Sequence, residues 1–295
     1  MKKVSIIITN YNKTEYIEET ILSALSQTYK NCEIIVIDDY SSTEEVEKLR
    51  GIEQKYKRKD IKFIYNDKNI GVVGTRNKAI KISSGEYILP LDGDDIIDSE
   101  YVKLGVEQLD SNPNLGIVYC DAHFIGEKKG SWDLPKYNPD LICIENVIFS
   151  AALFRKNDFI SVGGYNNIFN KGHEDWDLWL SIIELGREVY KIPLDLFAYR
   201  ILKKNSRSLS ANRLLHETTY KIMNEHPYLF TRSREVHKRV FCFPDEEELQ
   251  KQVARYRKKT IKYKRLTLSV FLLSLFLLCI ILNGYDDYFN LFRIK

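Results

Sequence analysis

Short apolar runs alternate with stretches of helical spacing over the first hundred residues of the chain. Polar or turn-forming residues end each run, which is typical of a strand buried on both faces of a sheet. Between the runs, apolar residues recur every three or four positions, as on one face of an amphipathic helix. The alternation predicts a β-α-β-α-β-α-β order and a mostly parallel sheet covered by helices. The predicted strands are residues 4–8, 32–37, 61–65 and 87–92, and the predicted helices are residues 14–25, 43–54 and 75–82.

The pattern is less regular after residue 100. Apolar runs predict further strands at residues 116–124 and 147–154. Large apolar side chains at helical spacing predict a helix over residues 176–183, with Glu174 and Asp175 at its N-terminus. Carboxylates are favoured at that end of a helix, so capping and a chemical role are both open for these two residues. A polar loop is predicted at residues 127–140, a turn at residues 163–165, and helices at residues 101–109 and 209–223.

The fourth predicted strand ends in three carboxylates within four residues, Asp92, Asp94 and Asp95. Like charges this close repel each other, and burial strengthens the repulsion. One interpretation is a site for Mg²⁺ or Mn²⁺, which prefer oxygen ligands and share their coordination shell with substrate phosphates. The other is a solvated acidic turn that caps the following helix. The stretch by itself leaves both interpretations open.

The predicted sheet places several carboxylates along one edge. Asp38 and Asp39 follow the second strand, while Asp92 and Asp94 follow the fourth. In open sheets of parallel strands, ligands bind beyond the carboxyl ends of the strands. This placement favours a ligand-binding role for the acidic stretch.

Composition and charge narrow the possible function classes. The 295 residues are 44% hydrophobic and 29% charged, which is typical of a folded globular protein. The net charge is +3, but residues 255–265 contribute seven Lys or Arg and no acidic residue, so the remainder carries −4. The main body of the chain therefore has no basic surface for nucleic acid. The five cysteines lie at least 23 residues apart, which predicts reduced thiols and neither a disulfide framework nor a zinc site.

Residues 266–282 form a stretch of seventeen residues without charge. As a helix they would span about 25 Å, slightly less than the ~30 Å hydrocarbon core of a bilayer. The basic residues 255–265 directly precede them, as on the cytoplasmic side of a membrane helix. We predict a single transmembrane helix in the cytoplasmic or inner membrane, with the larger N-terminal part in the cytoplasm; re-entrant or interfacial insertion and a buried soluble helix are alternatives. The predicted divisions are an α/β domain at residues 1–208, a basic helical juxtamembrane extension at residues 209–265, the membrane helix at residues 266–282 and a short tail at residues 283–295.

Seven short motifs follow one another along the chain. They are VSIIITNYN at residues 4–12, IIVIDDYSS at 34–42, NIG with GTRN at 69–77, LDGDD at 91–95, GGY at 163–165, ED at 174–175 and YR at 199–200. In this order they resemble the motifs of glycosyltransferase family 2, the inverting, nucleotide-sugar-dependent enzymes of the GT-A fold. The resemblance covers roughly residues 3–210. It implies a Rossmann-like mixed, mostly parallel sheet flanked by helices, here followed by a helical extension and one membrane helix.

The resemblance implies a donor site with three kinds of contact. An aromatic ring packs on the nucleotide base, and a carboxylate accepts the imide N–H of the base, which favours uridine. A cation at a helix N-terminus faces the diphosphate, and a divalent ion, Mn²⁺ or Mg²⁺, neutralises the charge on the leaving group. By resemblance, Thr9, Tyr11, Asp38 and Asp39 contact the nucleotide, Arg76 faces the diphosphate, Arg200 makes a further donor contact, Asp92 lies near the ribose or the metal, and Asp94 binds the metal.

The resemblance also implies an acceptor side. Asp175 is our first choice as general base, and Glu174 is the second. Such a base takes the proton from the acceptor hydroxyl as its oxygen attacks the anomeric carbon, and it typically contributes roughly 10²- to 10⁴-fold in rate. Gly164 and Trp176 are expected to contact the acceptor sugar, although Trp176 is equally suited to a core position beside Trp179.

The sequence departs from the family pattern at several positions. Thr9 and Tyr40 stand where the family usually has Pro and often has Gly. Leu202 stands where many members carry a histidine ligand, which leaves the third protein contact to the metal open. His173 is a candidate for that contact, and an ordinary loop position is its alternative.

The resemblance implies an enzyme that moves one hexosyl or N-acetylhexosaminyl unit from a nucleoside-diphosphate sugar to a saccharide hydroxyl. The predicted membrane helix favours a lipid-linked saccharide acceptor in cell-envelope polysaccharide, O-antigen or lipopolysaccharide synthesis, because tethering raises the effective concentration of a membrane-bound substrate. One apolar segment cannot form a polymer channel, so we expect no processive synthase. A non-catalytic sugar-nucleotide-binding scaffold is an alternative. A sugar nucleotidyltransferase is another, but the chain lacks a Gly-rich phosphate loop after the first strand.

Overall fold

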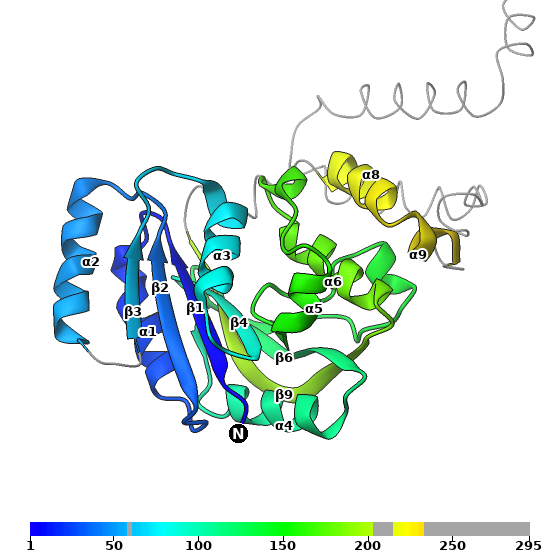
Figure 1. Ribbon diagram of the computed structural model, residues 1–295, viewed down its shortest axis with the longest axis horizontal. Helices are drawn as coiled ribbons and strands as arrows, with labels where there is room; N and C mark the ends of the chain where they lie inside the picture. Colours follow the sequence, from blue (N-terminus) through cyan, green and yellow to red (C-terminus); the bar gives the residue numbers. More distant parts are fainter. Residues whose placement is uncertain (58–60, 203–214, 233–295) are drawn as a thin grey trace, which may run out of the picture. The chain divides into compact units, whose positions relative to one another are not determined.

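A mixed sheet forms the centre of the protein, in a computed structural model that describes residues 1–57, 61–202 and 215–232 (Figure 1). Within these residues, nine strands lie in the order β3-β2-β1-β4-β8-β6-β9-β5, with β7 paired to β6. One apolar core extends through the sheet and its helices. The expected GT-A-like mixture of strands and helices is therefore present, although the sheet has two distinct halves.

The first half of the sheet is parallel throughout, as the sequence predicted. Its central strands are buried and rich in Val and Ile, which suits strands packed on both faces. Helix α3 packs on β1 and β2 and begins at Gly71 instead of residue 75. Gly71 has a φ of 75°, which glycine adopts without strain. The elements are β1 (Val4–Asn10), α1 (Thr14–Leu25), β2 (Cys32–Asp38), α2 (Thr43–Lys55), β3 (Ile61–Tyr65), α3 (Gly71–Ile82) and β4 (Tyr87–Asp92).

The register of these parallel strands brings their carboxyl ends to one edge. Thr9 of β1 lies beside Ile37 of β2 on one side and beside Asp92 of β4 on the other. Asn10 lies beside Asp38. The acidic stretch after β4 and the loop after β2 therefore flank the end of β1, where a ligand site was predicted.

The second half of the sheet mixes directions. Strand β8 runs antiparallel to both β4 and β6, whereas β9 runs parallel to β6 and antiparallel to β5. The prediction of a mostly parallel sheet therefore holds for the first half alone. The strands of this half are β5 (Ile96–Ile97), β6 (Leu115–Gly126), β7 (Gly130–Trp132), β8 (Leu153–Arg155) and β9 (Glu188–Ile201).

Two sequence expectations about the second half were wrong, and one strand was missed. The strand predicted at residues 147–154 is confined to β8, and residues 147–152 are mostly buried chain outside the sheet. Strand β7 occupies part of the predicted loop at residues 127–140. Strand β9 was not predicted, because Pro193 and a run of three exposed residues interrupt any regular alternation. A short apolar run does not show whether it pairs with another strand, and an irregular strand shows no alternation of apolar and polar residues. Long-range pairing decides the structure in both cases.

Three of the remaining helices pack on the second half of the sheet, with α5 against β8. Helix α4 packs on β6 and β9, and α6 packs on β6 (Figure 1). Helix α6 begins at Glu174, so the predicted placement of two carboxylates at its N-terminus is confirmed. The elements are α4 (Tyr101–Ser111), η1 (Leu141–Cys143), α5 (Lys156–Ser161), η2 (Asn167–Phe169), α6 (Glu174–Glu184), α8 (Leu215–Glu225) and α9 (Pro227–Arg232).

Several expectations about the C-terminal part fall outside the described residues. These include the start of the helix predicted at 209–223, the basic residues 255–265 and the apolar residues 266–282. Within the part of the chain that the structure describes, no helix is both long enough and apolar enough to cross a membrane.

Candidate active site

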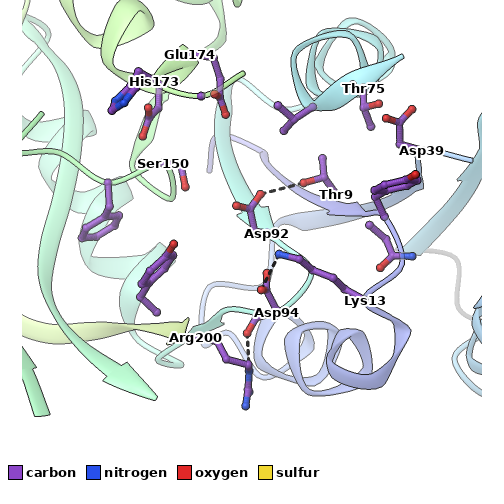
Figure 2. A pocket seen from close by; sticks show the side chains of 18 of the residues that line it. Thr9, Lys13, Asp39, Thr75, Asp92, Asp94, Ser150, His173, Glu174 and Arg200 are labelled. Carbon is purple, nitrogen blue, oxygen red and sulfur yellow. Dashed lines mark hydrogen bonds and ion pairs between the residues drawn. The ribbon is translucent and has the colours of Figure 1, made fainter. Parts of the chain in front are cut away.

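A cleft of about 940 Å³ lies at the carboxyl ends of the parallel strands. We call its lining residues between positions 9 and 94 the N-terminal wall, and those between positions 132 and 202 the C-terminal wall. Figure 2 shows Asp92 between Asp39, from the N-terminal wall, and His173, from the C-terminal wall. The cleft therefore joins the two halves of the sheet.

The acidic stretch lies in the N-terminal wall. One carboxylate oxygen of Asp92, Oδ1, accepts a hydrogen bond from Thr9 Oγ1 at 3.1 Å and another from Arg76 Nη2 at 2.7 Å. Asp94 Oδ2 forms an ion pair with Lys13 Nζ at 2.7 Å (Figure 2). Both carboxylates line the cleft, and each already has a cationic partner from the protein.

The electrostatics of this stretch follow from crowding and burial. Burial raises the pKa of Asp94, and the nearby charge of Asp92 adds to the effect. Burial alone would lower the pKa of Lys13, but the carboxylates of Asp94 and Asp92 outweigh it and raise that pKa. Lys13 thus stays charged and neutralises part of the acidic stretch.

Asp95 links the acidic stretch to the second half of the sheet. It is fully buried, and its Oδ1 accepts a hydrogen bond from the backbone N–H of Arg200 on β9 at 2.9 Å. Burial raises the pKa of Asp95 well above its usual value. Arg200 in turn donates from Nε to the carbonyl of Asp94 at 2.8 Å, and its guanidinium lies 4.8 Å from the centroid of the Tyr16 ring. Asp95 therefore fixes β9 against the site and does not cap the next helix.

Two adjacent aspartates, Asp38 and Asp39, lie at the end of β2. Asp39 lines the cleft, although Asp38 was the one expected to make the main contact to the nucleotide base. Asp38 was expected to hold the nucleotide base, but it is buried outside the lining residues. Its carboxylate accepts hydrogen bonds from Asn10 Nδ2 at 2.7 Å and from the hydroxyl and N–H of Ser41 at 2.6 and 2.9 Å. Asp39 lines the cleft, and its Oδ1 accepts from Asn66 Nδ2 and the Ile70 N–H, both at 2.9 Å. The geometry gives the cleft position to Asp39 and a loop-stabilising position to Asp38.

Arg76, which was expected to face the diphosphate, does not reach the cleft in this structure. Its side chain is fully buried and does not line the cleft. It bridges Asp92 and Glu174, with Nη1 2.9 Å from Glu174 Oε1, and its guanidinium lies 5.6 Å from the centroid of the Tyr165 ring. Gly71, Val72 and Thr75 of α3 line the cleft, whereas the Arg76 side chain reaches Glu174 at the start of α6. Arg76 therefore connects the two walls from behind.

The N-terminus of α6 supplies the carboxylates of the C-terminal wall. Glu174 is buried, and its Oε1 is bound by Arg76. Asp175 is half-buried, lines the cleft and accepts a hydrogen bond from the Trp176 N–H at 2.9 Å. Burial raises the pKa of Asp175 to about 6, with a further contribution from the charge of Glu174. Of the two candidate bases, Asp175 has the accessible carboxylate and a pKa suited to accepting a proton near neutral pH.

The two expected acceptor contacts lie outside the cleft. Trp176 is fully buried, and its indole N–H donates to the carbonyl of Ile142 at 2.6 Å, so it is a core residue. Gly164 has a φ of 83°, and a Cβ there would lie 2.8 Å from the side-chain oxygen of Asn77. Glycine at this position therefore serves a tight turn.

The comparison with protein families agrees with this geometry. Residues 5–171 match the family model described as Glycosyl transferase family 2. The chain belongs to glycosyl transferase family 2. An uncharacterized glycosyltransferase of Haemophilus influenzae is 33% identical over 239 residues, covering 75% of this chain and 72% of the relative. The chain is therefore a glycosyltransferase of the class that uses nucleotide sugars.

Other relatives of this family 2 chain are longer. An uncharacterized glycosyltransferase of Rickettsia conorii is 38% identical over 241 residues, and chondroitin synthase of Escherichia coli is 26% identical over 229 residues. The chain spans only 37% and 32% of those two proteins. Similarity over a third of a longer protein does not extend the activity of that whole protein to this chain.

Two solved structures share the fold of this family 2 member. A mannosyltransferase from Pyrobaculum calidifontis, in complex with GDP-Man and Mn²⁺, has a TM-score of 0.64 at 16% identity and covers 94% of this chain and 80% of its own. S. aureus TarS, in complex with UDP-GlcNAc, has a TM-score of 0.59 at 19% identity and covers 83% of this chain and 77% of its own. At these identities the likeness shows the GT-A fold alone.

Asp92 and Asp94 are the carboxylates of the acidic stretch that could hold a divalent metal in the cleft. Within residues 1–57, 61–202 and 215–232, no three His, Cys, Asp or Glu side chains are grouped as a metal site. Asp92 and Asp94 supply two carboxylates, and Leu202 lines the cleft without offering a ligand. Mg²⁺ and Mn²⁺ commonly bind one or two carboxylates and complete their shell with water and substrate phosphates. The pair therefore fits an ion that binds together with the diphosphate, provided that Lys13 leaves Asp94.

Sequence reasoning gave no role to several cleft residues of this family 2 chain, Lys13 and Tyr199 among them. Lys13 directly follows the NYN motif, and its charge beside a predicted acidic site was the available signal. Tyr199 of β9 lines the C-terminal wall and was noted only as a motif residue. Trp132 of β7, which was expected to shape the sugar pocket, also lines this wall.

Proposed function

We propose that this glycosyltransferase moves one sugar, with inversion at the anomeric carbon, from a UDP-sugar to a hydroxyl of a saccharide acceptor in a metal-dependent reaction. One observation carries the proposal: a single cleft places the Asp92–Asp94 pair in one wall and Asp175 in the other. Direct displacement needs a stabilised leaving group on one side of the anomeric carbon and a base on the other. The two walls provide these two functions separately.

The N-terminal wall is suited to the nucleoside diphosphate. Tyr11 is 51% exposed at the cleft and offers its ring to the base, and Asp39 offers a carboxylate to the imide N–H of uracil. Asp92 and Asp94 would hold Mg²⁺ or Mn²⁺, which stabilises the departing diphosphate when bound. Lys13, which pairs with Asp94 in this structure, can instead pair with the phosphates of the donor. TarS was solved with UDP-GlcNAc and the Pyrobaculum mannosyltransferase with GDP-Man and Mn²⁺, which supports a donor of this chemical type.

The C-terminal wall is suited to activating the acceptor. The Asp175 carboxylate takes the proton of the acceptor hydroxyl as the oxygen forms its bond to the anomeric carbon and the bond to the diphosphate breaks. Attack from the side opposite the leaving group inverts the anomeric configuration. With a pKa of about 6, Asp175 is mostly ionised at neutral pH and can still accept a proton in the transition state. Arg76 holds the neighbouring Glu174, which orients the first turn of α6.

For the acceptor, we favour a lipid-linked saccharide at the cytoplasmic face of a membrane, as an intermediate of envelope polysaccharide synthesis. The support is the sequence of residues 255–282, in which a basic run precedes an uncharged apolar run. The donor sugar is of the hexosyl or N-acetylhexosaminyl type. Deleting residues 255–295 tests the membrane part, because the truncated protein should move from the membrane fraction to the soluble fraction.

The decisive experiment measures release of nucleoside diphosphate from a panel of nucleotide sugars, with saccharide acceptors and with Mn²⁺, Mg²⁺ or EDTA. We expect one UDP-sugar to turn over, EDTA to stop the reaction, and Asp94→Asn to lower turnover at least 100-fold. Glu107→Gln is the matched control, because Glu107 is an exposed carboxylate on α4 outside the cleft. Binding of UDP-sugars without transfer by any donor would instead support a non-catalytic scaffold.

A further inference from the structure

The C-terminal wall contains an aromatic surface that the donor chemistry does not use. Trp132 and Tyr199 are half-buried and line the cleft, with ring centroids 5.1 Å apart and ring planes inclined by 41°. Trp132 lies on β7 and Tyr199 lies on β9, so each ring belongs to a strand of the same sheet. Two large rings thus face the cleft from a rigid support.

Other rings pack against this pair. Phe149 and Phe197 also line the cleft, are almost fully buried and stack with centroids 4.4 Å apart. Trp132 stacks on Phe124 at 5.2 Å and contacts Phe149 at 6.2 Å. Such packing fixes the orientation of the exposed rings before any ligand binds, which lowers the entropic cost of binding.

The same strands fix the aromatic pair relative to the acidic stretch. Strand β5 begins directly after Asp95 and pairs Ile96 with Ala198, the neighbour of Tyr199. The hydrogen bond from the Arg200 N–H to Asp95 holds the residue on the other side of Tyr199. Tyr199 is therefore held between two direct connections to the turn that carries Asp94.

We propose that Trp132 and Tyr199 form the platform on which a pyranose ring of the acceptor stacks. The proposal rests on the glycosyl transfer proposed above. Aromatic rings present a broad apolar face, and one face of a pyranose ring presents C–H groups while its hydroxyls point outward. Asp175 lies in the same wall as the pair, and Tyr11 is the only aromatic side chain that lines the N-terminal wall within the described residues. The platform therefore belongs to the sugar that supplies the nucleophilic hydroxyl.

Intrinsic fluorescence gives a direct binding test on the full chain. The chain has three tryptophans, and Trp176 and Trp179 are fully buried, so acrylamide quenching reports chiefly on Trp132. The probes are methyl glycosides of glucose, galactose, mannose and N-acetylglucosamine, each with UDP and Mn²⁺ present, and sorbitol is the open-chain control. We expect at least one methyl glycoside to reduce quenching saturably, whereas sorbitol leaves quenching unchanged.

Variants of the second ring identify the site. Tyr199→Ala should raise the concentration needed for half-maximal protection about tenfold, and Tyr199→Phe should restore most of the effect. Tyr190→Ala is the matched control, because Tyr190 is an exposed tyrosine on the same strand that does not line the cleft. Circular dichroism checks that each variant is folded. Equal protection in Tyr199→Ala and wild type would overturn the proposal.

Kinetics separate this proposal from the proposed function. Trp132→Ala should raise the acceptor KM about tenfold with a much smaller change in the donor KM, and Trp132→Phe should fall between it and wild type. An unchanged acceptor KM in Trp132→Ala would overturn the platform while leaving glycosyl transfer intact. Protection of Trp132 by a nucleotide sugar alone would also overturn it, because the platform would then hold the donor sugar. Absence of transfer with every donor would count against the proposed function, and the fluorescence test would still decide the platform.

Discussion

The two walls of the cleft are built in different ways. The N-terminal wall stands on the carboxyl ends of parallel strands and on the loops that follow them. The C-terminal wall is assembled from β7, β9, non-strand chain and the start of α6. The nucleotide side thus uses the regular edge of a parallel sheet, whereas the acceptor side combines several kinds of element that pack together.

The largest expected effect concerns Asp175 in the C-terminal wall. Asp175→Asn should lower kcat roughly 10²- to 10⁴-fold, because the variant has no group that takes the acceptor proton. In the wild type, the pKa of Asp175 is raised to about 6 by burial, so the base is protonated below that pH. The kcat/KM should therefore fall about tenfold per pH unit below pH 6 and reach a plateau above about pH 7. Initial rates measured from pH 5 to pH 8.5 check both statements.

A nearby carboxylate provides the control for Asp175. Glu145 is exposed and precedes the lining segment that begins at Asn146, so Glu145→Gln should keep the wild-type rate and the wild-type pH profile. A flat wild-type profile between pH 5 and pH 8, together with normal turnover in Asp175→Asn, would remove the base from the C-terminal wall.

The contrast between the walls also explains what the sequence predicted. The four parallel strands and the edge bearing Asp39, Asp92 and Asp94 were predicted correctly, because continuous apolar runs end directly at these residues. The direction in which a side chain points could not be predicted from the sequence. Asp38 and Asp39 are adjacent, and only the fold shows which of them lines the cleft. The cleft position belongs to Asp39 and not to Asp38 because of the loop geometry, which a pattern of apolar residues does not encode.

The second half of the molecule was harder to predict for a physical reason. Strand β9 contains Pro193 and irregular register with β6, so its alternation is weak. Trp176 and Arg76 carry groups typical of binding sites, yet both are fully buried; the Trp176 indole bonds to a backbone carbonyl and Arg76 pairs with carboxylates. Burial of a tryptophan or a paired arginine depends on distant elements, and a single sequence gives no measure of it.

The next effect in size concerns Arg76, which connects the walls. Arg76→Met should lower the free energy of unfolding by about 3–5 kcal/mol, because it removes the buried arginine that pairs with the buried Glu174 carboxylate. Urea denaturation measures this loss. Lys103→Met is the control, since the pair of Lys103 with Glu100 is exposed and its loss should leave the urea denaturation curve almost unchanged.

A second substitution sharpens the interpretation of Arg76. Adding Glu174→Gln to Arg76→Met should recover part of the lost stability, because it removes the uncompensated buried charge. A loss below 1 kcal/mol in Arg76→Met would mean that the two walls are held together by apolar packing alone.

A smaller effect is expected behind the C-terminal wall, at His226. The imidazole lies between Asp177 and Glu184 of α6, with each ring nitrogen 3.1 Å from a carboxylate oxygen. Burial alone would lower the pKa of His226, but the two carboxylates outweigh it and raise that pKa above 6.5. The charged ring therefore stabilises the fold fully below pH 6.5, and this contribution is lost as the pH rises through the folded-state pKa. His226→Gln should cost about 2 kcal/mol at pH 6 and less at pH 9, as measured by urea denaturation.

A second histidine controls for the general effect of pH. His123 forms a similar contact with Asp195 at 2.8 Å, but both side chains are more than a third exposed. His123→Gln should therefore change the unfolding free energy by about 0–1 kcal/mol at either pH. Equal losses in the two variants, or a His226→Gln loss that does not change with pH, would contradict a charged contact between α6 and the residues after α8.

The smallest effect returns to the N-terminal wall and its two adjacent aspartates. Asp39→Asn should weaken UDP binding about tenfold in calorimetry, because an amide at the cleft cannot replace a charged acceptor for the imide N–H. Asp38→Asn should instead lower the free energy of unfolding by about 1–2 kcal/mol, since it disturbs the hydrogen bonds to Asn10 and Ser41. The two variants differ by one position and remove the same charge, so only geometry separates their outcomes. A greater loss of UDP affinity in Asp38→Asn than in Asp39→Asn would return the base contact to Asp38 and show that the loop after β2 rearranges when the donor binds.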